Sequence, residues 1–227
     1  MDINSDLGEL RSMLEDGTQE ALMPFITSAN IACGGHAGDE HTMRITVEQA
    51  RRYHVAIGAH PGYPDRENFG RRELDMPLHA VEQTVYDQIR ALAAIASDIV
   101  HVKPHGALYN QAVKNKALAA AIARGVARYR RDVALMGLAG SPMLEAFRDE
   151  GFQVLAEAFA DRRYEPDGTL RSRQHSDALL KDPAEAAAQA VSIALRGQAQ
   201  TICIHSDTPG AVEIARAVSL ALKGMKQ

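Results

Sequence analysis

The 227-residue chain has no tryptophan, only 2 cysteines and 5% aromatic residues. No apolar run approaches the ~20 residues that a membrane-spanning helix needs, which argues against a helical membrane protein. The net charge of -4 has the wrong sign for bulk electrostatic binding of nucleic acid or anionic membranes. No Walker-type G-x-x-x-x-G-K-[ST] sequence occurs, so the chain has no recognisable ATP loop of its own.

The scarcity of cysteine excludes a disulfide-stabilised scaffold. Cys33 and Cys203 both lie inside apolar, strand-like runs. We expect two buried, reduced thiols, and a catalytic thiol is the alternative. The acidic start, MDINSDLGE, leads directly into a strand, so we expect no signal peptide and a cytoplasmic protein.

Seven short apolar runs are present, and each ends in a small cluster of polar residues. Their β-branched, almost continuously apolar character is typical of strands that are buried on both faces. The predicted strands are residues 2–6, 28–34, 55–60, 99–104, 133–139, 153–159 and 201–205.

Helical patterns follow most of these runs. One has a clear start signal, with Asp182 as N-cap and Pro183 at the first helical position. The predicted helices are residues 40–53, 77–96, 115–130 and 142–149, one that begins at 183, and 210–223. Residues 61–77 and 161–181 are predicted to be long loops, which in a compact domain usually serve a site.

Alternating strands and helices predict an α/β fold with parallel strands and right-handed crossovers. No Gly- or Ser-rich linker divides the chain, so we expect one domain over residues 1–227. The first strand is not followed by G-x-G-x-x-G, which argues against a Rossmann domain, but the pattern alone does not separate a closed barrel from an open sheet. In a parallel barrel the carboxyl ends of the strands share one face, where the polar clusters would meet.

Four of the nine histidines fall at predicted strand ends, and they are His36, His60, His105 and His205. Histidine carries protons near neutral pH, so we expect at least two of them to be functional. With Asp6 and Asp207 these groups could also bind zinc, manganese or iron, although no compact H-x-x-x-H or H-E-x-x-H motif occurs. Three more histidines lie within or beside helices and are predicted at the surface: His41, His54 and His79.

The sharpest local cluster is Lys103-Pro104-His105-Gly106. Residues 103 and 105 of a strand point to the same side, where each cation would disfavour the other and lower both pKa values. That arrangement suits a general base or a lysine that faces a developing oxyanion. The alternative is a lysine paired with a carboxylate such as Asp6 or Glu157.

The loop after the sixth strand carries Arg162, Arg163, Arg171 and Arg173 among acidic residues. Arginine forks bind carboxylate and phosphate, so this loop is a candidate anion site, and a solvated charged loop is the alternative. In the other long loop, Tyr63 or Phe69 either packs on a small substrate or anchors the loop. The LAGSP segment at 138–142 is interpreted as a simple strand-to-helix turn, and a turn that directs backbone amides toward an anion is the alternative.

Seven segments taken together resemble the family of 5-oxoprolinase A subunits, also called LamB/YcsF. They are DINSDLGE, SANIACGGHAGD, GAHPGYPDRENFGRRE, VKPHGALYN, GLAGSP, FADRRYEPDGTL and HSDTPGAV, in this order along nearly the whole chain. The resemblance implies a seven-stranded β/α barrel like that of glycoside hydrolases and polysaccharide deacetylases. It also implies ATP-dependent opening of 5-oxo-L-proline to L-glutamate together with two partner subunits, which would handle ATP. Ser206 and Ser176 replace glycines expected in the family pattern, and the segment between Leu195 and Thr201 is shorter than usual.

Carried over residue by residue, the resemblance implies catalytic roles for Asp6, His36, His60, Lys103, His105 and Glu157. It implies substrate binding by Asn4, Asp39, Asp65, Asp161, Arg162, His205 and Asp207. A divalent metal, if present, would be held by Asp6, His60 and His105. Two other classes stay open, a metal-dependent, deacetylase-like hydrolase that acts alone and a non-catalytic ligand-binding subunit. Self-association of the chain also stays open.

Overall fold

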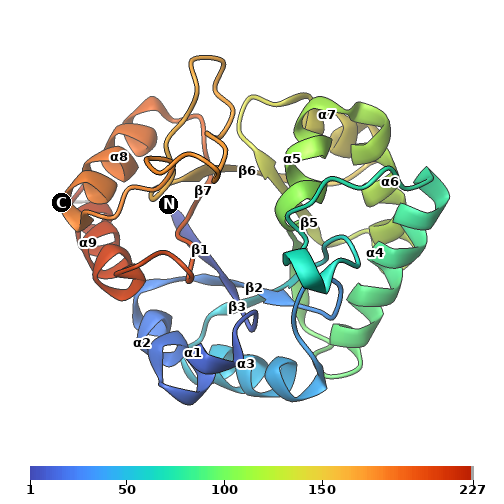
Figure 1. Cartoon of the computed structure of the whole chain (residues 1–227), viewed down its shortest axis with the longest axis horizontal. Helices are drawn as coiled ribbons and strands as arrows, with labels where there is room; N and C mark the ends of the chain where they lie inside the picture. The colour runs from blue at the N-terminus through green and yellow to red at the C-terminus, as the bar shows by residue number, and fades with distance from the viewer. Residues whose placement is uncertain (226–227) are drawn as a thin grey trace.

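The computed structural model describes residues 1–225. Within them, parallel strands form a closed barrel in which each strand pairs with the next and the last pairs with the first. Figure 1 shows this ring of strands with the helices around it. The strands are β1 (Asp2–Leu7), β2 (Ser28–Ala32), β3 (Ala56–His60), β4 (Ile99–Val102), β5 (Ala134–Leu138), β6 (Val154–Phe159) and β7 (Thr201–Cys203). The predicted parallel α/β fold is confirmed, and the barrel is closed.

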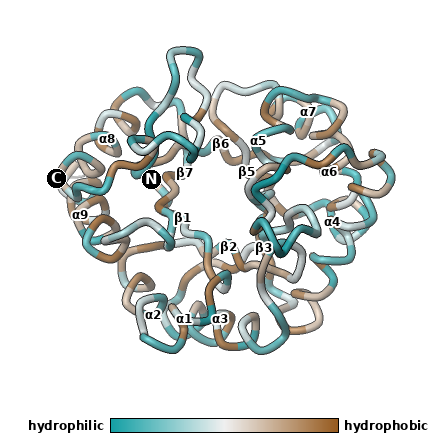
Figure 2. The backbone as a smooth tube through the Cα atoms, in the orientation of Figure 1, coloured by the Kyte–Doolittle hydropathy of each residue, from teal (hydrophilic) through white to brown (hydrophobic). Residues whose placement is uncertain are grey.

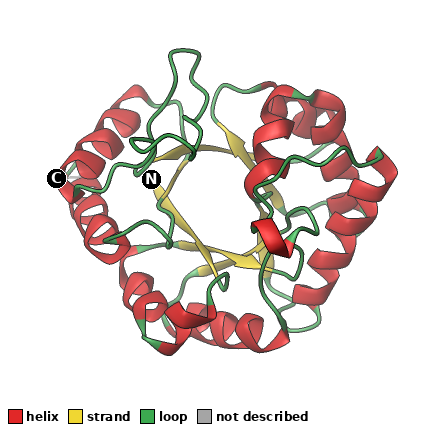
Figure 3. Ribbon diagram, in the orientation of Figure 1, coloured by secondary structure: helices red, strands yellow, loops and turns green. Residues whose placement is uncertain are grey.

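Helices cover the outside of the barrel, as Figure 3 shows. The α-helices are α1 (Arg11–Glu15), α2 (Thr18–Leu22), α3 (Glu40–Arg52), α4 (Leu78–Ala93), α5 (Gly106–Lys114), α6 (Lys116–Ala127), α7 (Pro142–Asp149), α8 (Pro183–Arg196) and α9 (Ala211–Gly224). Short 3-10 turns are η1 (Met23–Phe25) and η2 (Arg66–Asn68). The six predicted helices are present. The sequence pattern missed α1 and α2, which have 5 residues each, and α5, whose start has no side-chain cap.

Local sequence explains where two of the longer helices begin. Asp39 caps α3 through a capping box with Thr42, and Asp182 accepts hydrogen bonds from the first turn of α8. Buried aliphatic residues of strands and helices form one continuous core. In Figure 2 the hydrophobic segments lie mainly in the strands and flanking helices, and the long loops are mostly hydrophilic. None of the helices in residues 1–225 combines the length and apolar character needed to cross a bilayer.

The barrel interior is more polar than the nearly continuous apolar runs suggest. Asn30 donates hydrogen bonds to Asn4 and Asp6, and a ring nitrogen of His101 lies 2.8 Å from the Asn30 Oδ1 atom. A Cβ atom at Gly58 would lie 2.0 Å from His101, so only glycine leaves space for this imidazole. Side chains of β1, β2 and β4 therefore build a hydrogen-bonded floor below the carboxyl ends of the strands.

The extended backbone continues beyond the end of β4. The amide of Lys103 donates to the Ala59 carbonyl at 2.9 Å, and the amide of His105 donates to the Pro61 carbonyl at 2.9 Å. Residues 103 and 105 therefore keep the alternation of a strand, as predicted, although β4 itself ends at Val102. Gly106, with a φ of 54°, then turns the chain directly into α5.

Candidate functional site

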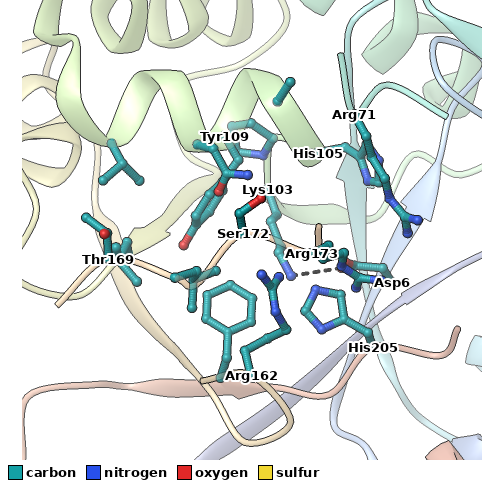
Figure 4. A pocket seen from close by; sticks show the side chains of 18 of the residues that line it. Asp6, Arg71, Lys103, His105, Tyr109, Arg162, Thr169, Ser172, Arg173 and His205 are labelled. Atoms are coloured by element: carbon teal, nitrogen blue, oxygen red, sulfur yellow. Dashed lines mark hydrogen bonds and ion pairs between the residues drawn. The ribbon is translucent and has the colours of Figure 1, made fainter. Parts of the chain in front are cut away.

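A pocket of about 810 Å³ opens at the carboxyl ends of the strands. Its lining comes from β1, β3, β5 and β6, from residues just after β1, β4 and β7, from α5 and from the two long loops. Figure 4 shows the labelled side chains converging on it, with a dashed line between Lys103 and Asp6. This is the face on which parallel barrels build active sites, and the volume suits a small-molecule ligand.

Lys103 lies at the base of the pocket among buried acidic groups. Its Nζ atom is 2.9 Å from Asp6 Oδ1, 2.8 Å from Glu157 Oε1 and 3.1 Å from Cys203 Sγ. Burial alone would lower the pKa of Lys103, but attraction by Asp6 and then by Glu157 raises it well above its ordinary value. The prediction that Lys103 and His105 lower each other's pKa is therefore wrong for the lysine. The alternative, a lysine paired with Asp6 and Glu157, is correct.

Four side chains that follow β1 to β4 meet beside this lysine, and we call them the histidine wall: Glu9, His36, His60 and His105. Glu9 Oε1 lies 2.9 Å from His36 Nε2, 3.0 Å from His105 Nδ1 and 3.7 Å from His60 Nε2. The His60 Nε2 and His105 Nδ1 atoms are 3.0 Å apart. The rings of His36 and His105 stack with centroids 3.6 Å apart.

The loop of residues 61–77 holds this wall in place. Phe69 packs edge-on against His36 and His105, and its carbonyl lies 2.9 Å from His105 Nε2. A Cβ atom at Gly70 would lie 2.6 Å from the Cβ of His36, so glycine is required for this approach. Tyr63 is buried and donates a hydrogen bond to Gln111 at 2.6 Å. Both aromatic residues therefore anchor the loop.

Burial and neighbouring charges shift the pKa values of the three histidines in different directions. Burial and then repulsion by His105 lower the pKa of His36 to about 3. Burial also lowers the pKa of His105, against attraction by Glu9. For His60, burial is the largest cause and lowers the pKa, but attraction and hydrogen bonding by Asp6 and attraction by Glu9 together outweigh it and raise the pKa. The wall therefore contains neutral imidazoles beside one that protonates more easily.

On the opposite side of the pocket, the loop of residues 161–181 presents Arg162 and Arg173, which we call the arginine wall. Arg162 is 5% exposed, its NH2 group donates to the Arg171 carbonyl at 2.6 Å, and its Nε atom has no hydrogen-bond partner. Burial and then repulsion by Arg173 lower the pKa of Arg162 to about 10. Among residues 1–225, Arg162 makes no ion pair. A buried guanidinium without a carboxylate favours an anionic ligand.

Two aspartates organise the rest of this side. Asp161 is buried, lies 3.0 Å from the Nδ1 atom of His205 and accepts a hydrogen bond from Thr208 at 2.6 Å. Asp207 pairs with Arg173 at 2.9 Å and also with Arg71 from the other long loop. Asp161 and Asp207 therefore position His205, Arg173 and Arg71 and do not themselves line the pocket.

Five predicted substrate-binding residues do not line the pocket: Asp161 and Asp207, and also Asp39, Asp65 and Asn4. Asp39 caps α3 and pairs with the exposed Arg11, because its place before the helix directs its carboxylate to the first turn. Asp65 accepts a hydrogen bond from Asn68 within its own loop. Asn4 lies in the barrel interior and donates to Thr201. The other sequence-predicted residues line the pocket or contact residues that do.

Other residues were not singled out from the sequence. Glu9 follows Asp6 in the same polar cluster at the end of β1, so its place at a strand end was an available signal. Tyr109 comes from the undetected α5, and its hydroxyl is buried without a partner, with a pKa raised by burial and then by Glu157. His101 lies inside the barrel, where the sequence showed only an apolar strand.

Two groups of side chains place potential metal ligands within 4.8 Å of one another: Glu9, His36, His60 and His105, and separately Asp6, Cys203 and His205. The first contains two of the three predicted ligands. Asp6 falls in the second group, although its Oδ2 atom is also 3.4 Å from His60 Nε2. The expected buried thiols are present, since Cys33 and Cys203 are both free and buried.

The surface predictions also match the structure, since His41, His54 and His79 are all exposed. In the LAGSP segment, Ser141 donates its hydroxyl to the Leu138 carbonyl at 2.6 Å. This hydrogen bond closes the local turn that the sequence predicts.

Comparisons with known proteins cover most or all of the chain and indicate one family. The A subunit of 5-oxoprolinase from Chloroflexus aurantiacus is 51% identical over 227 residues, which is 93% of this chain and 90% of that protein. The protein of the same name from Shouchella clausii is 47% identical and covers 95% of this chain and 91% of its own length.

The solved structure of a lactam utilization protein from Thermus thermophilus has a TM-score of 0.91 at 37% identity, covering 100% of this chain and 97% of that one. A truncated 3-deoxy-D-arabino-heptulosonate 7-phosphate synthase from Thermotoga maritima, at 11% identity and a TM-score of 0.53, is similar in fold alone, covering 100% of this chain and 85% of that one. The sequence model of the LamB/YcsF family matches residues 1–227. The chain therefore belongs to the LamB/YcsF family.

Proposed function

We propose that this chain is the lactam-binding subunit of an ATP-dependent 5-oxoprolinase, which opens 5-oxo-L-proline to L-glutamate together with two partner subunits. The observation that carries the proposal is Arg162, a buried guanidinium that lines the pocket and has no carboxylate partner in residues 1–225. The substrate has one carboxylate, and an arginine fork binds such a group through two charge-assisted hydrogen bonds. The names of the relatives support the same reading.

The remaining pocket residues fit the chemistry of lactam opening. An unstrained lactam is a poor electrophile, and transfer of phosphate from ATP to its oxygen would activate the ring carbon toward water. Lys103 stays protonated between Asp6 and Glu157, so it stabilises negative charge on the substrate and does not act as a base. Activation of the water belongs to the histidine wall and Asp6, on the other side of the same pocket.

ATP handling is assigned to the partner subunits, because the chain lacks a Walker-type loop. The pocket of about 810 Å³ is larger than so small a lactam needs, which leaves space for a phosphorylated substrate. Because the reaction consumes ATP, we expect the complex to work in the cytoplasm.

The test is glutamate formation from 5-oxoproline and ATP by the chain alone, by the partner subunits alone and by the complete complex. We expect turnover only in the complete complex. In the complex, Arg162→Met should weaken 5-oxoproline use by roughly 10- to 100-fold, because a charge-assisted hydrogen bond contributes about 1.5–3 kcal/mol. Arg163→Met is the matched control, since Arg163 is exposed and lies next to Arg162 in sequence. Robust turnover without partners, or equal effects of both variants, contradicts the proposal.

A metal-dependent hydrolase that acts alone is the second candidate, and the histidine wall is the observation that favours it. The two functions differ in their need for ATP. Hydrolysis of 5-oxoproline or of an acetylated substrate by the isolated chain without ATP, abolished by a chelator, would establish this second function in place of the first.

A further inference from the structure

We infer that Glu9, His36, His60 and His105 form a binding site for one divalent first-row cation of the zinc type. The donor set is three imidazoles and one carboxylate, which suits zinc, cobalt or iron. The residues come from the ends of four consecutive strands, and all four side chains are at least nine-tenths buried. The ligand set differs from the one expected from the sequence, because Glu9 and His36 replace Asp6.

The spacing of the ligand atoms fits a tetrahedral cation. Zinc–nitrogen and zinc–oxygen bonds of about 2.0–2.1 Å at tetrahedral angles place neighbouring ligand atoms about 3.3 Å apart. The measured separations from Glu9 Oε1 are 2.9, 3.0 and 3.7 Å, and His60 Nε2 lies 3.0 Å from His105 Nδ1. The His36 and His105 rings are stacked with an interplanar angle of 3°, so one of these rings would have to turn about its side-chain bonds for both nitrogens to point at the same cation.

Backbone carbonyls orient two of the imidazoles for this role. His60 Nδ1 lies 2.7 Å from the Lys103 carbonyl, and His105 Nε2 lies 2.9 Å from the Phe69 carbonyl. A carbonyl only accepts, so in the neutral imidazoles these nitrogens carry the protons, and the lone pairs of His60 Nε2 and His105 Nδ1 face each other and Glu9 Oε1. Metal-binding histidines typically donate their second ring N–H to a carbonyl in this way. These two lone pairs, 3.0 Å apart, and the Glu9 carboxylate, 3.0 Å from His105 Nδ1, repel one another unless a proton or a cation lies between them, and a shared cation would satisfy all three at once.

The other group of potential ligands does not offer an equivalent site. Lys103 Nζ lies 2.9 Å from Asp6 Oδ1 and 3.1 Å from Cys203 Sγ, so an ammonium already occupies the space between them. A second cation there would meet the repulsion of the lysine. The histidine wall contains no lysine or arginine, and it is therefore the better cation site.

The location gives the site a chemical role. Glu9, His60 and His105 line the pocket, whereas His36 lies behind them. When bound, the cation would act as a Lewis acid toward a water or carbonyl oxygen in the pocket. The protein residues fix its position, while Arg162 and Lys103 hold the substrate. The inference does not depend on the identity of the substrate.

The test is metal binding by the complete chain, without substrate or ATP. Chelator-treated protein should take up one equivalent of Zn²⁺ or Co²⁺ in calorimetry and elemental analysis, and Co²⁺ should give a tetrahedral absorption spectrum. Glu9→Gln and His36→Gln should each lose at least ~100-fold in affinity, because even outer-shell changes cost about 10- to 100-fold. His205→Gln should retain binding, which separates this site from the Asp6 group, and His79→Gln controls for surface histidines.

Absence of stoichiometric binding by the wild-type chain overturns the inference, as does unchanged affinity in both folded variants. If the variants do not fold, the imidazole nitrogen NMR signals of the wild type decide. His60 and His105 should shift on addition of one equivalent of Zn²⁺, and unshifted signals overturn the site. A negative result leaves the 5-oxoprolinase proposal standing, since that proposal is tested by glutamate formation.

Discussion

The two walls of the pocket differ in whether their charged groups have partners of opposite charge. In the histidine wall, Glu9 contacts His36 and His105, and two rings are fixed by backbone carbonyls. Each wall has a buried nitrogen without a hydrogen-bond partner, His36 Nδ1 in the first and Arg162 Nε in the second, but among residues 1–225 the charged Arg162 also makes no ion pair. The first wall is thus organised before any ligand arrives, and the second keeps an unbalanced charge.

The difference follows from the elements that build each wall. The histidine wall stands at or just beyond the ends of β1 to β4, where His60 pairs with Ala32 in the β2–β3 register and the amide of His105 donates to the Pro61 carbonyl. The arginine wall belongs to a 161–181 loop that has only isolated bridges, Arg162 with Leu179 and Tyr164 with Leu170. Rigid strands suit a site for a cation or a proton, and a loop with a free guanidinium suits capture of an anionic substrate.

His105→Gln tests the histidine wall and has the largest expected effect. The change removes the side chain that lies between Glu9 and His60 and so disrupts activation of the water. Turnover by the complete complex should fall by roughly 10²–10⁴-fold, with 5-oxoproline binding by the chain nearly unchanged. Turnover within threefold of the wild type would mean that the histidine wall is not the site of the chemistry.

The Lys103→Met variant tests the role of the Lys103 ammonium group, which lies between the histidine wall and the arginine wall. Its loss leaves Asp6 and Glu157 as buried carboxylates without a cation, which should cost about 3–5 kcal/mol of unfolding free energy. Turnover should also fall by ~10²–10³-fold, because a cation at the developing charge is lost. Urea denaturation measures the first effect. Adding Asp6→Asn to the variant should recover part of the stability, and its failure to do so would contradict the pairing.

The pH dependence of the unfolding free energy tests the role of His101, which lies in the hydrogen-bonded floor beneath both walls. Burial lowers its pKa to about 4 from an ordinary value of 6.5. The unfolded chain therefore binds more protons between these values, so the stability from neutral His101 is full above pH 6.5 and is lost as the pH falls toward 4. At roughly 1.4 kcal/mol per unit, the loss is on the order of 3 kcal/mol. His101→Asn should flatten the pH dependence of the unfolding free energy in this window, and an unchanged slope would assign that dependence to other groups.

Asp207→Asn tests the support of the arginine wall and has the smallest expected effect. Asp207 pairs with Arg173 and Arg71, which belong to different loops. Such a partly exposed pair contributes up to about 1 kcal/mol, so KM for 5-oxoproline should rise by no more than about fivefold, with kcat preserved. A large fall in kcat with constant KM would instead place Asp207 in the chemistry.

Much of the candidate site follows from position in the sequence. Asp6, His60, Lys103, His105 and Glu157 each lie at or just after the end of a predicted strand, and all of them are buried around the pocket. The expectation that a polar residue after a strand belongs to the site fails for Asp39, whose carboxylate caps a helix instead. It also fails to separate Arg162 from Arg163, because neighbouring loop residues carry the same charge and only packing buries one of them.

The sequence by itself determined the order of strands and helices, since apolar runs and helix-start signals are local properties. The tertiary structure alone decided that the sheet closes, with β7 beside β1, and that Glu9 meets three histidines from other strands. The tertiary structure also raises the pKa of Lys103, which the sequence predicted to be lowered. The reason is that this pKa depends on carboxylates that lie 97 and 54 positions away in sequence. Burial and charge at the site arise from these long-range contacts, and no local pattern in the chain encodes them.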